Sequence, residues 1–234
     1  MTTDYLRWTR DERPALFSHI QHADTTEVAG EAWIASVGRP ELVCFLKRMK
    51  ATGRTIGDTL CDGAGWFVCA PRASRYFISA VPVDLNRRNQ EVLRFATKAK
   101  RDYALAILNS NVFYWYWRAI SDGFWVTHEH LAGMPIPRKG QSEDEIRSLG
   151  EQLWNAADEC RASHVWCGKR IATHNFNKRM DILIDIDDWI VKQVAPDMDL
   201  PRDIFAQYKS NSFLHPENIP GLGGSADAGD EELE

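Results

Sequence analysis

The stretch between Tyr103 and Ile120 constrains the fold more than any other part of the chain. It is largely apolar and rich in aromatic residues, and its main polar interruptions are the triplet at 109–111 and Arg118. Interruptions of this kind favour a helix buried in a protein core over a membrane span. With Asp102 as N-cap and Gly123 as the stop, the pattern predicts one long buried helix that ends at Ser121.

Hydrophobic periodicity predicts a mixture of helices and strands around this central helix. Helices are expected at 40–51, 142–166 and 180–195, strands at 66–70, 76–81 and 92–96, and an extended segment at 134–137. The first two strands are expected to pair as a hairpin around residues 71–74, and Ser142 with Glu145 forms a capping box. We therefore expect an α+β fold, in which a twisted, mostly antiparallel sheet packs on the buried aromatic-rich helix and a helical extension follows.

The same pattern divides the chain into four parts. We expect an N-terminal arm or docking segment at 1–38, a central domain at 39–140, a helical C-terminal region at 141–219 and an acidic tail at 220–234. The tail is rich in Gly, Asp and Glu, and a composition of this kind predicts disorder.

The charge is unevenly distributed along the chain. The net charge is −5, but the segment from Arg39 to Arg101 has 13 Lys/Arg against 5 Asp/Glu, a local +8. The segment from Asp181 to the C-terminus has 3 Lys/Arg against 13 Asp/Glu, a local −10. A basic segment attracts a phosphate backbone because screening confines the interaction to about 8–10 Å. The negative net charge of the whole chain therefore does not exclude a nucleic-acid partner.

Cysteine usage and the first residues indicate a compartment. Five cysteines with irregular spacing do not form a disulfide framework, and the charged N-terminal segment lacks an apolar signal sequence. We expect a cytoplasmic protein with reduced thiols and no membrane partner.

The sequence matches several kinds of catalytic or metal site poorly or not at all. Adenine-N6 methylation requires an Asn/Asp-Pro-Pro-aromatic loop, and this chain has no Pro-Pro pair. Gly63-x-Gly65 is a weak match to a nucleotide-binding turn, because a strand rather than a helix is expected after it. The residues Cys160, His164, Cys167 and His174 have spacings that allow a zinc site, but a core stripe explains them better. We expect no catalytic residue, metal or cofactor on this chain.

A resemblance to a known family rests on the region 108–137. Leu108-Asn109-Ser110, the aromatic run 113–117, Ser121-Asp122-Gly123-Phe124 and Pro135-Ile136-Pro137 occur in the order found in a target-recognition domain. The region resembles that domain in type IIG restriction–modification enzymes and in the PglX-like adenine-N6 methyltransferases of phage-defence systems. Arg13-Pro14-Ala15-Leu16-Phe17 is similar to the segment that leaves their catalytic domain. The resemblance covers most of 5–195 and lacks the catalytic half.

The resemblance implies a DNA-sequence specificity subunit of a split adenine-N6 methyltransferase. Its partners would be double-stranded DNA and a catalytic subunit that binds S-adenosylmethionine; a truncated fragment of a longer enzyme is the other way to explain the missing half. Arg and Lys side chains on loops contact phosphates and guanine edges in such modules. The expected DNA contacts are Arg72, Arg75, Arg87, Arg88, Lys98, Lys100, Arg101, Phe124, Trp125, Thr127 and His128.

Two alternatives remain open at this point. The aromatic run 113–117 is expected to pack in the core rather than stack on bases, and each single cation can equally be solvated surface charge. A former recognition domain can also serve as a non-catalytic protein-interaction or regulatory module of a defence complex. DNA binding that weakens steeply with salt distinguishes the two functions.

Overall fold

A computed structural model describes residues 1–4, 6–30, 34–63, 65–74, 77–138, 143–166, 169–210, 212–215, 217 and 219. Its helices are α1 (Leu16–His19), α2 (Pro40–Ala51), α3 (Lys98–Asn109), α4 (Asn111–Ile120), α5 (His128–Ala132), α6 (Asp144–Asn155) and α7 (Met180–Val194). Its strands are β1 (Trp66–Pro71), β2 (Gln90–Phe95), β3 (Arg161–Trp166) and β4 (Lys169–His174). Short 3-10 helices lie at Arg10–Ala15, Thr26–Val28, Ile56–Thr59, Phe176–Arg179 and Ala206–Lys209. The α+β prediction is confirmed.

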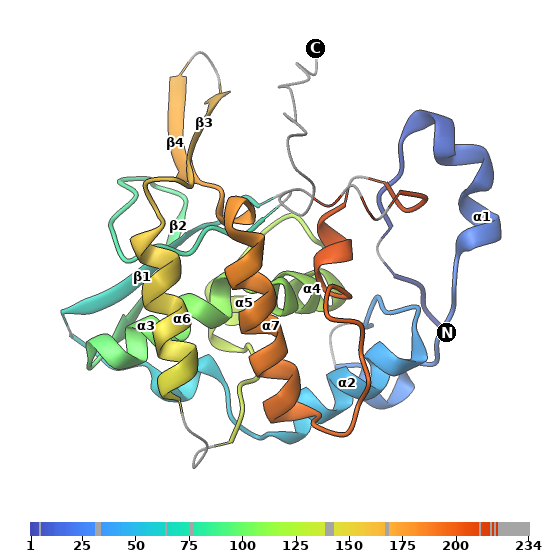
Figure 1. The fold of residues 1–234 in the computed structure, drawn as a ribbon, viewed down its shortest axis with the longest axis horizontal. Helices are drawn as coiled ribbons and strands as arrows, with labels where there is room; N and C mark the ends of the chain where they lie inside the picture. The colour runs from blue at the N-terminus through green and yellow to red at the C-terminus, as the bar shows by residue number, and fades with distance from the viewer. Residues whose placement is uncertain are drawn as a thin grey trace.

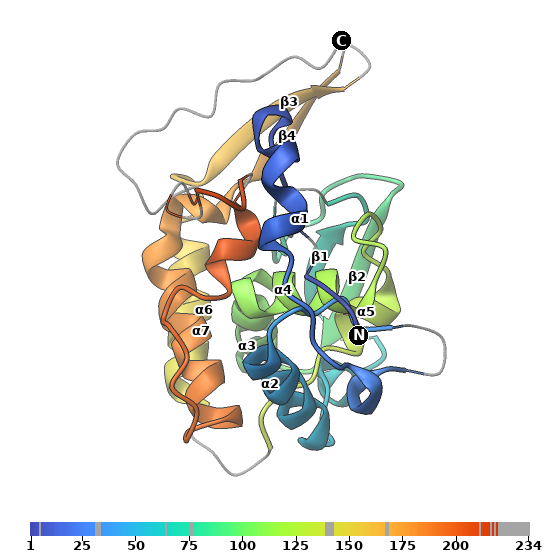
Figure 2. The same cartoon turned by 90° about the vertical axis from the view of Figure 1, so that its right-hand side faces the viewer.

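The elements form three layers with α3 and α4 in the middle (Figure 2). Helices α6 and α7 cover one side of this central pair, and β1, β2 and α5 cover the other. Every residue from 101 to 119 is buried, including Trp115 and Trp117. One hydrophobic core runs from Val28 to Ile219, so residues on both sides of the expected boundary at 140 share it.

The predicted single helix is two helices, because Ser110 interrupts it. Ser110 has an extended ψ of 156°, and its hydroxyl accepts a hydrogen bond from the Phe113 N–H at 2.9 Å, as an N-cap does. The first helix also begins earlier than predicted: Thr97 caps α3, whereas Asp102 lies inside it. Helix α4 ends at Ile120, one residue before the predicted end.

The predicted hairpin between 66–70 and 76–81 is wrong. Strand β1 pairs antiparallel with β2, so that Trp66 lies opposite Phe95. Of the described residues 77–81 in the expected partner, Val81 alone forms a bridge with β1, at Cys69. Cys69 therefore lies between Val81 on one side and Val92 of β2 on the other. The neighbouring residue of the segment, Ala80, bonds to a helix side chain: the Asn109 amide donates to the Ala80 carbonyl at 2.8 Å and accepts from the Ala80 N–H at 2.9 Å.

The predicted helix at 142–166 is correct only in its first half. Helix α6 ends at Asn155, and the chain then forms an antiparallel ribbon of β3 and β4, with Arg161 opposite His174. Both strands carry β-branched residues, whose side chains favour a strand over a helix. The expected cap Ser142 lies outside the described residues, as does the acidic tail; Glu143 is the N-cap of α6. The helix predicted at 180–195 is confirmed as α7, and the one at 40–51 as α2.

A buried polar network joins α7 to the N-terminus of α4. The Asp187 carboxylate accepts hydrogen bonds from the Asn111 side chain at 2.7 Å and from the Val112 N–H at 3.1 Å. The Lys209 ammonium donates to the Asn177 side chain at 3.0 Å. Burial raises the pKa of Asp187, and burial lowers the pKa of Lys209, whose charge is attracted to Asp187. Polar side chains thus fill a part of the protein interior that apolar side chains usually occupy.

Candidate nucleic-acid interface

Two segments far apart in the sequence meet beside the β1–β2 sheet. Ala73, in the turn after β1, forms a β-bridge with Trp125, in the loop after α4. The Val126 N–H donates to the Arg72 carbonyl at 2.7 Å, and the Arg72 N–H donates to the Asn89 carbonyl at 3.1 Å. These backbone bonds place Arg72 next to the loop that carries Phe124 and Trp125.

The loop after α4 is held by hydrogen bonds from its own side chains and from α4. The Arg118 guanidinium donates to the Gly123 carbonyl at 2.7 Å, and Gly123 has a φ of 69° that favours glycine. The Trp117 indole N–H donates to the Trp125 carbonyl at 3.0 Å. The Asp122 carboxylate accepts from the Phe124 and Trp125 N–H groups at 2.9 and 3.2 Å, and the bond from Phe124 is the main cause of its lowered pKa.

This fixed loop presents two aromatic side chains to solvent. Phe124 is 48% exposed and Trp125 is 41% exposed. Their rings meet edge to face, with centroids 5.0 Å apart. Exposed neighbouring aromatics are uncommon without a binding role, because burying such rings is strongly favourable.

A hollow of about 600 Å³ lies beside this aromatic pair. Its lining is Ile34, Arg72, Asn89, Ile120, Ser121, Asp122, Trp125, Thr127 and His130. We call it the Arg72–Trp125 hollow. It combines a cation and an aromatic face with hydroxyl and amide groups and the Asp122 carboxylate. Cations, aromatic faces and such polar groups are also found where proteins bind phosphates and bases.

Thr127 and His130 have fixed roles at the edge of the hollow. The Thr127 hydroxyl caps α5, and the Thr127 N–H donates to His130 Nδ1 at 3.2 Å. With Nδ1 as acceptor, the neutral ring carries its proton on Nε2. Burial lowers the pKa of His130, so the neutral ring is the form present at pH 7. Sequence reasoning omitted His130 from the site, although the Thr127-x-x-His130 spacing of a capping box was a usable signal.

The Arg72 side chain forms a partly buried ion pair with Glu91. The Arg72 Nε atom lies 3.1 Å from the Glu91 carboxylate, and the side chains of Arg72 and Glu91 are 44% and 19% exposed. A phosphate that binds the Arg72 guanidinium therefore has to replace Glu91 as its partner.

The other residues that were predicted to contact DNA differ in their exposure. Arg88, Lys100 and His128 are exposed. Lys98 is bound to two carboxylates, those of Asp102 and Glu151, each at 2.8 Å. Arg75 lies outside the described residues.

Two further expected cations, Arg101 and Arg87, contact other parts of the protein. Arg101 is 9% exposed, donates to Asp102 at 2.7 Å, and lies over the Trp66 ring at 5.0 Å. The Arg87 guanidinium donates to the Ala172 carbonyl of β4, and burial lowers its pKa. These two side chains hold elements together, and the surface that faces solvent consists of the remaining described residues.

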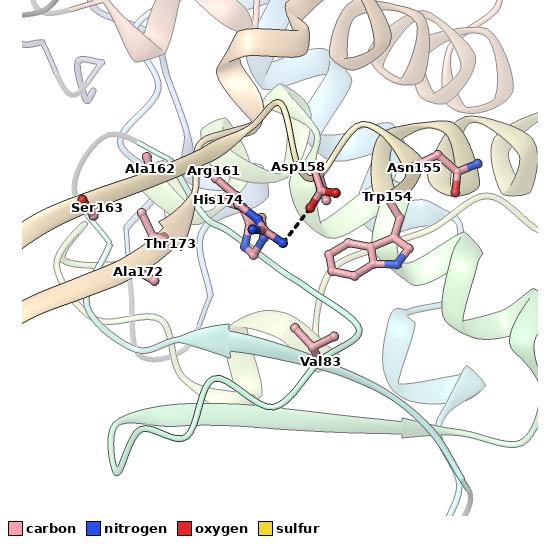
Figure 3. A pocket seen from close by; sticks show the side chains of 11 residues that line it. Val83, Trp154, Asn155, Asp158, Arg161, Ala162, Ser163, Ala172, Thr173 and His174 are labelled. Carbon is pink, nitrogen blue, oxygen red and sulfur yellow. Dashed lines mark ion pairs between the residues drawn. The ribbon is translucent and has the colours of Figure 1, made fainter.

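A second hollow, of about 870 Å³, lies at the foot of the β3–β4 ribbon and was not expected from the sequence (Figure 3). Trp154 and His174 line it with ring centroids 5.8 Å apart, and Asp158 forms an ion pair with Arg161 at 2.8 Å. We call it the Trp154–His174 hollow. It was missed because the predicted helix at 142–166 concealed the ribbon.

Of the four residues whose spacing allows a zinc site, Cys167 lies outside the described residues, and the side chain of His164 is not described. Within the described residues, no group of three or more His, Cys, Asp or Glu side chains could hold a metal ion. None of the described helices is both long and apolar enough to cross a bilayer.

Comparison with models of known protein families, with curated proteins and with solved structures found no match. The resemblance to target-recognition domains therefore stays a hypothesis, and the functional argument depends on the geometry of the site.

Proposed function

We propose that this chain is the DNA-sequence specificity subunit of a split adenine-N6 DNA methyltransferase in a restriction–modification or phage-defence system. The observation that carries the proposal is the Arg72–Trp125 hollow, where a cation and an exposed aromatic pair from distant segments meet on a hydrogen-bonded loop. The protein acts in the cytoplasm on double-stranded DNA.

Each part of the hollow suits one task in DNA recognition. Arg72 binds a phosphate or the O6 and N7 atoms of guanine. Trp125 and Phe124 provide faces for stacking or for apolar contact with a base, and Thr127 supplies a hydroxyl at the edge. Preorganisation of the loop by Arg118 and Trp117 lowers the entropic cost of binding.

The methyl transfer itself is assigned to a separate catalytic subunit. The sequence lacks the Asn/Asp-Pro-Pro-aromatic loop that holds an adenine for N6 methylation. S-adenosylmethionine is therefore expected on the partner, and this chain supplies sequence recognition alone.

A reconstitution experiment tests this assignment. Capture of the tagged chain from its native host should recover a protein with an Asn-Pro-Pro-Tyr loop. Adenine methylation of duplex DNA should require both chains, and Arg72→Ala/Trp125→Ala in this chain should reduce it at least tenfold. Methylation by the pure 234-residue chain alone would refute the proposal.

A protein-interaction or regulatory module of a defence complex is the second candidate. It is favoured by exposed apolar side chains on the N-terminal segment: Phe17 is 84% exposed and Trp8 is 44% exposed. Such side chains are typical of a protein contact. Partner capture that needs Phe17 and Trp8, combined with no DNA binding by the chain or by the complex, would establish this function instead.

A further inference from the structure

Several polar side chains that line the Arg72–Trp125 hollow already bond to other parts of the protein. The Ser121 hydroxyl donates its one proton to the Trp117 carbonyl at 2.6 Å. The Thr127 hydroxyl caps α5 and lies 3.2 Å from His130 Nδ1. These bonds hold the edge of the hollow in place and leave these groups little capacity to bind a ligand.

Asp122 and Asn89 are the lining residues with hydrogen-bonding capacity to spare. One Asp122 oxygen, Oδ1, accepts both N–H bonds of the loop, from Phe124 and from Trp125. Within the part of the chain that the structure describes, the second oxygen, Oδ2, has no hydrogen-bond or ion-pair partner, and the Asn89 side-chain amide has none either. Both residues are exposed, so a ligand in the hollow can reach these groups.

The part of the hollow next to Asp122 suits a neutral ligand better than a phosphate. The hydrogen bond from the Phe124 N–H is the main cause that lowers the pKa of Asp122, so the carboxylate is charged at pH 7. A charged carboxylate repels a phosphate and accepts hydrogen bonds from N–H groups. A DNA base is neutral at this pH and offers such groups.

Trp125 gives the hollow an aromatic face that a paired base cannot use. Its side chain is 41% exposed, and its ring meets the Phe124 ring edge to face at 85°, a contact that covers at most one face of a ring. In a duplex, neighbouring bases cover both faces of each base, and only the base edges reach the grooves. Stacking on Trp125 therefore requires a base that has left the stack.

Two isoleucines add apolar walls to the hollow. Ile34 comes from the N-terminal segment and is 70% exposed, and Ile120 ends α4 and is half-buried. Sites for small planar ligands combine apolar walls with a few polar groups and have volumes of about 300–1,000 Å³. The hollow, with about 600 Å³, has this composition and this size.

We propose that the Arg72–Trp125 hollow holds one DNA base that has left the stack, and that the free Asp122 oxygen selects a base with an exocyclic amino group over thymine, which has none. The inference rests on the proposed function and names the ligand of the same site. This base belongs to the sequence that the chain reads and is distinct from the adenine that the catalytic subunit would methylate.

The selection follows from the hydrogen-bonding capacity of the two free groups. A carboxylate only accepts hydrogen bonds, so it pairs with the amino group of cytosine and repels the O4 carbonyl of thymine. The Asn89 amide both donates and accepts, so it suits either base. Discrimination is therefore assigned to Asp122.

Two labelled single strands test the selection. Oligodeoxycytidine and oligodeoxyuridine of equal length carry the same charge, and the amino group at C4 of cytosine is replaced by a carbonyl in uracil. Single strands offer their bases without the cost of unpairing. In fluorescence anisotropy at pH 7.5 and 100 mM salt, the full chain should bind the cytosine strand at least about fivefold more tightly.

Asp122→Asn should reverse this preference. The loop N–H groups still need an acceptor, so the amide oxygen takes the place of Oδ1 and an N–H donor takes the place of Oδ2. The ratio of the two affinities cancels the general effect of a lost negative charge. Asp11→Asn is the matched control: it removes an exposed carboxylate just before α1, which lies at the opposite end of the molecule from β1 and β2 (Figure 1). It should change the ratio by less than about twofold.

A duplex with one unpaired cytosine tests whether the base has to leave the stack. The cost of unpairing is already met in this duplex. The natural chain should bind it at least about fivefold more tightly than the fully paired duplex, and one unpaired uridine should give a smaller gain. Trp125→Ala should abolish the gain, whereas Phe17→Ala, which truncates an exposed aromatic residue of α1, should preserve it.

The outcomes separate this inference from the proposed function. If the natural chain binds no DNA, both fall. If it binds duplex DNA and Arg72→Ala/Trp125→Ala weakens this binding, but the unpaired cytosine gives no gain, only the inference about the hollow falls. Equal affinity for the two single strands, or a ratio that Asp122→Asn changes no more than Asp11→Asn does, would also overturn it.

Discussion

Replacement of Asp187 by Asn should destabilise the protein strongly, because it leaves the buried Lys209 without its counter-charge. Asp187 and Lys209 are both fully buried, at 1% and 2% exposure, and the Asp187→Asn change preserves shape while it removes the charge. The two groups attract one another without a direct salt bridge between them, and the loss of one of two interacting buried charges costs up to about 3–5 kcal/mol. Total stability of a domain is about 5–15 kcal/mol, so the loss is a large fraction of it.

Urea unfolding followed by tryptophan fluorescence measures this effect. With a slope near the upper end of about 1–3 kcal/mol/M, the midpoint should fall by about 1–1.7 M. Asp185→Asn, on the exposed face of the same helix, is the matched control and should change stability by less than about 0.5 kcal/mol.

A double-mutant cycle decides whether the charge is the cause. Lys209→Gln keeps a donor for Asn177, so Asp187→Asn/Lys209→Gln converts the pair into neutral amides. The double variant should be more stable than the sum of the two single losses predicts, by about 2 kcal/mol or more. Additive losses, or a cost of Asp187→Asn below about 1 kcal/mol, would show that the electrostatic reasoning is wrong.

Three further predictions concern packing, pH and DNA contact. Gly150→Ala should cost about 1–3 kcal/mol in urea unfolding, because an added Cβ would lie 2.2 Å from the Asp102 carbonyl on α3; a change below 0.5 kcal/mol would contradict the close packing of α3 on α6. Burial lowers the pKa of His174, so its contribution to stability should be present above pH 6.5 and lost as the pH falls. His174→Phe should therefore reduce the fall in the urea midpoint of unfolding between pH 7.5 and 5. A fall as large as that of the natural chain would contradict this. Trp125→Ala should weaken duplex binding about fivefold to a hundredfold, since stacking on one base contributes about 1–3 kcal/mol, while Trp8→Ala should have no effect.

Local signals in the sequence were sufficient for several elements. Pro40 at the first helical position and the apolar face that follows it predicted α2 correctly. The aromatic run at 113–117 was expected to pack in the core, where its side chains lie. These signals depend on neighbouring residues alone, so no tertiary information was needed.

Other features depend on contacts between distant residues. Strand β1 pairs with β2 over its whole length, whereas the expected partner bonds to β1 at Val81 and to the Asn109 side chain of α3 at Ala80. Nothing in the local sequence of either strand shows the contact with Asn109. The ribbon was missed because Cys160 and His164 continue the helical spacing of α6 although the helix ends at Asn155.

The candidate site also has some features that the sequence predicted and others that depend on contacts between distant residues. Arg72 and Trp125 were expected separately and lie together because of the bridge between Ala73 and Trp125. Arg101 was expected as a contact from its charge alone, and only the structure shows its burial against Asp102 and Trp66. Charge can be read from a sequence, whereas exposure depends on the whole fold.

The salt dependence of duplex binding tests the central claim most directly. If the chain reads DNA through Arg72 and its neighbours, the affinity for a short duplex should fall linearly with salt on a log–log plot between 50 and 200 mM. Arg72→Ala should lower the slope by about 0.9. An affinity that is undetectable at 50 mM salt, with the catalytic subunit present, would contradict the claim.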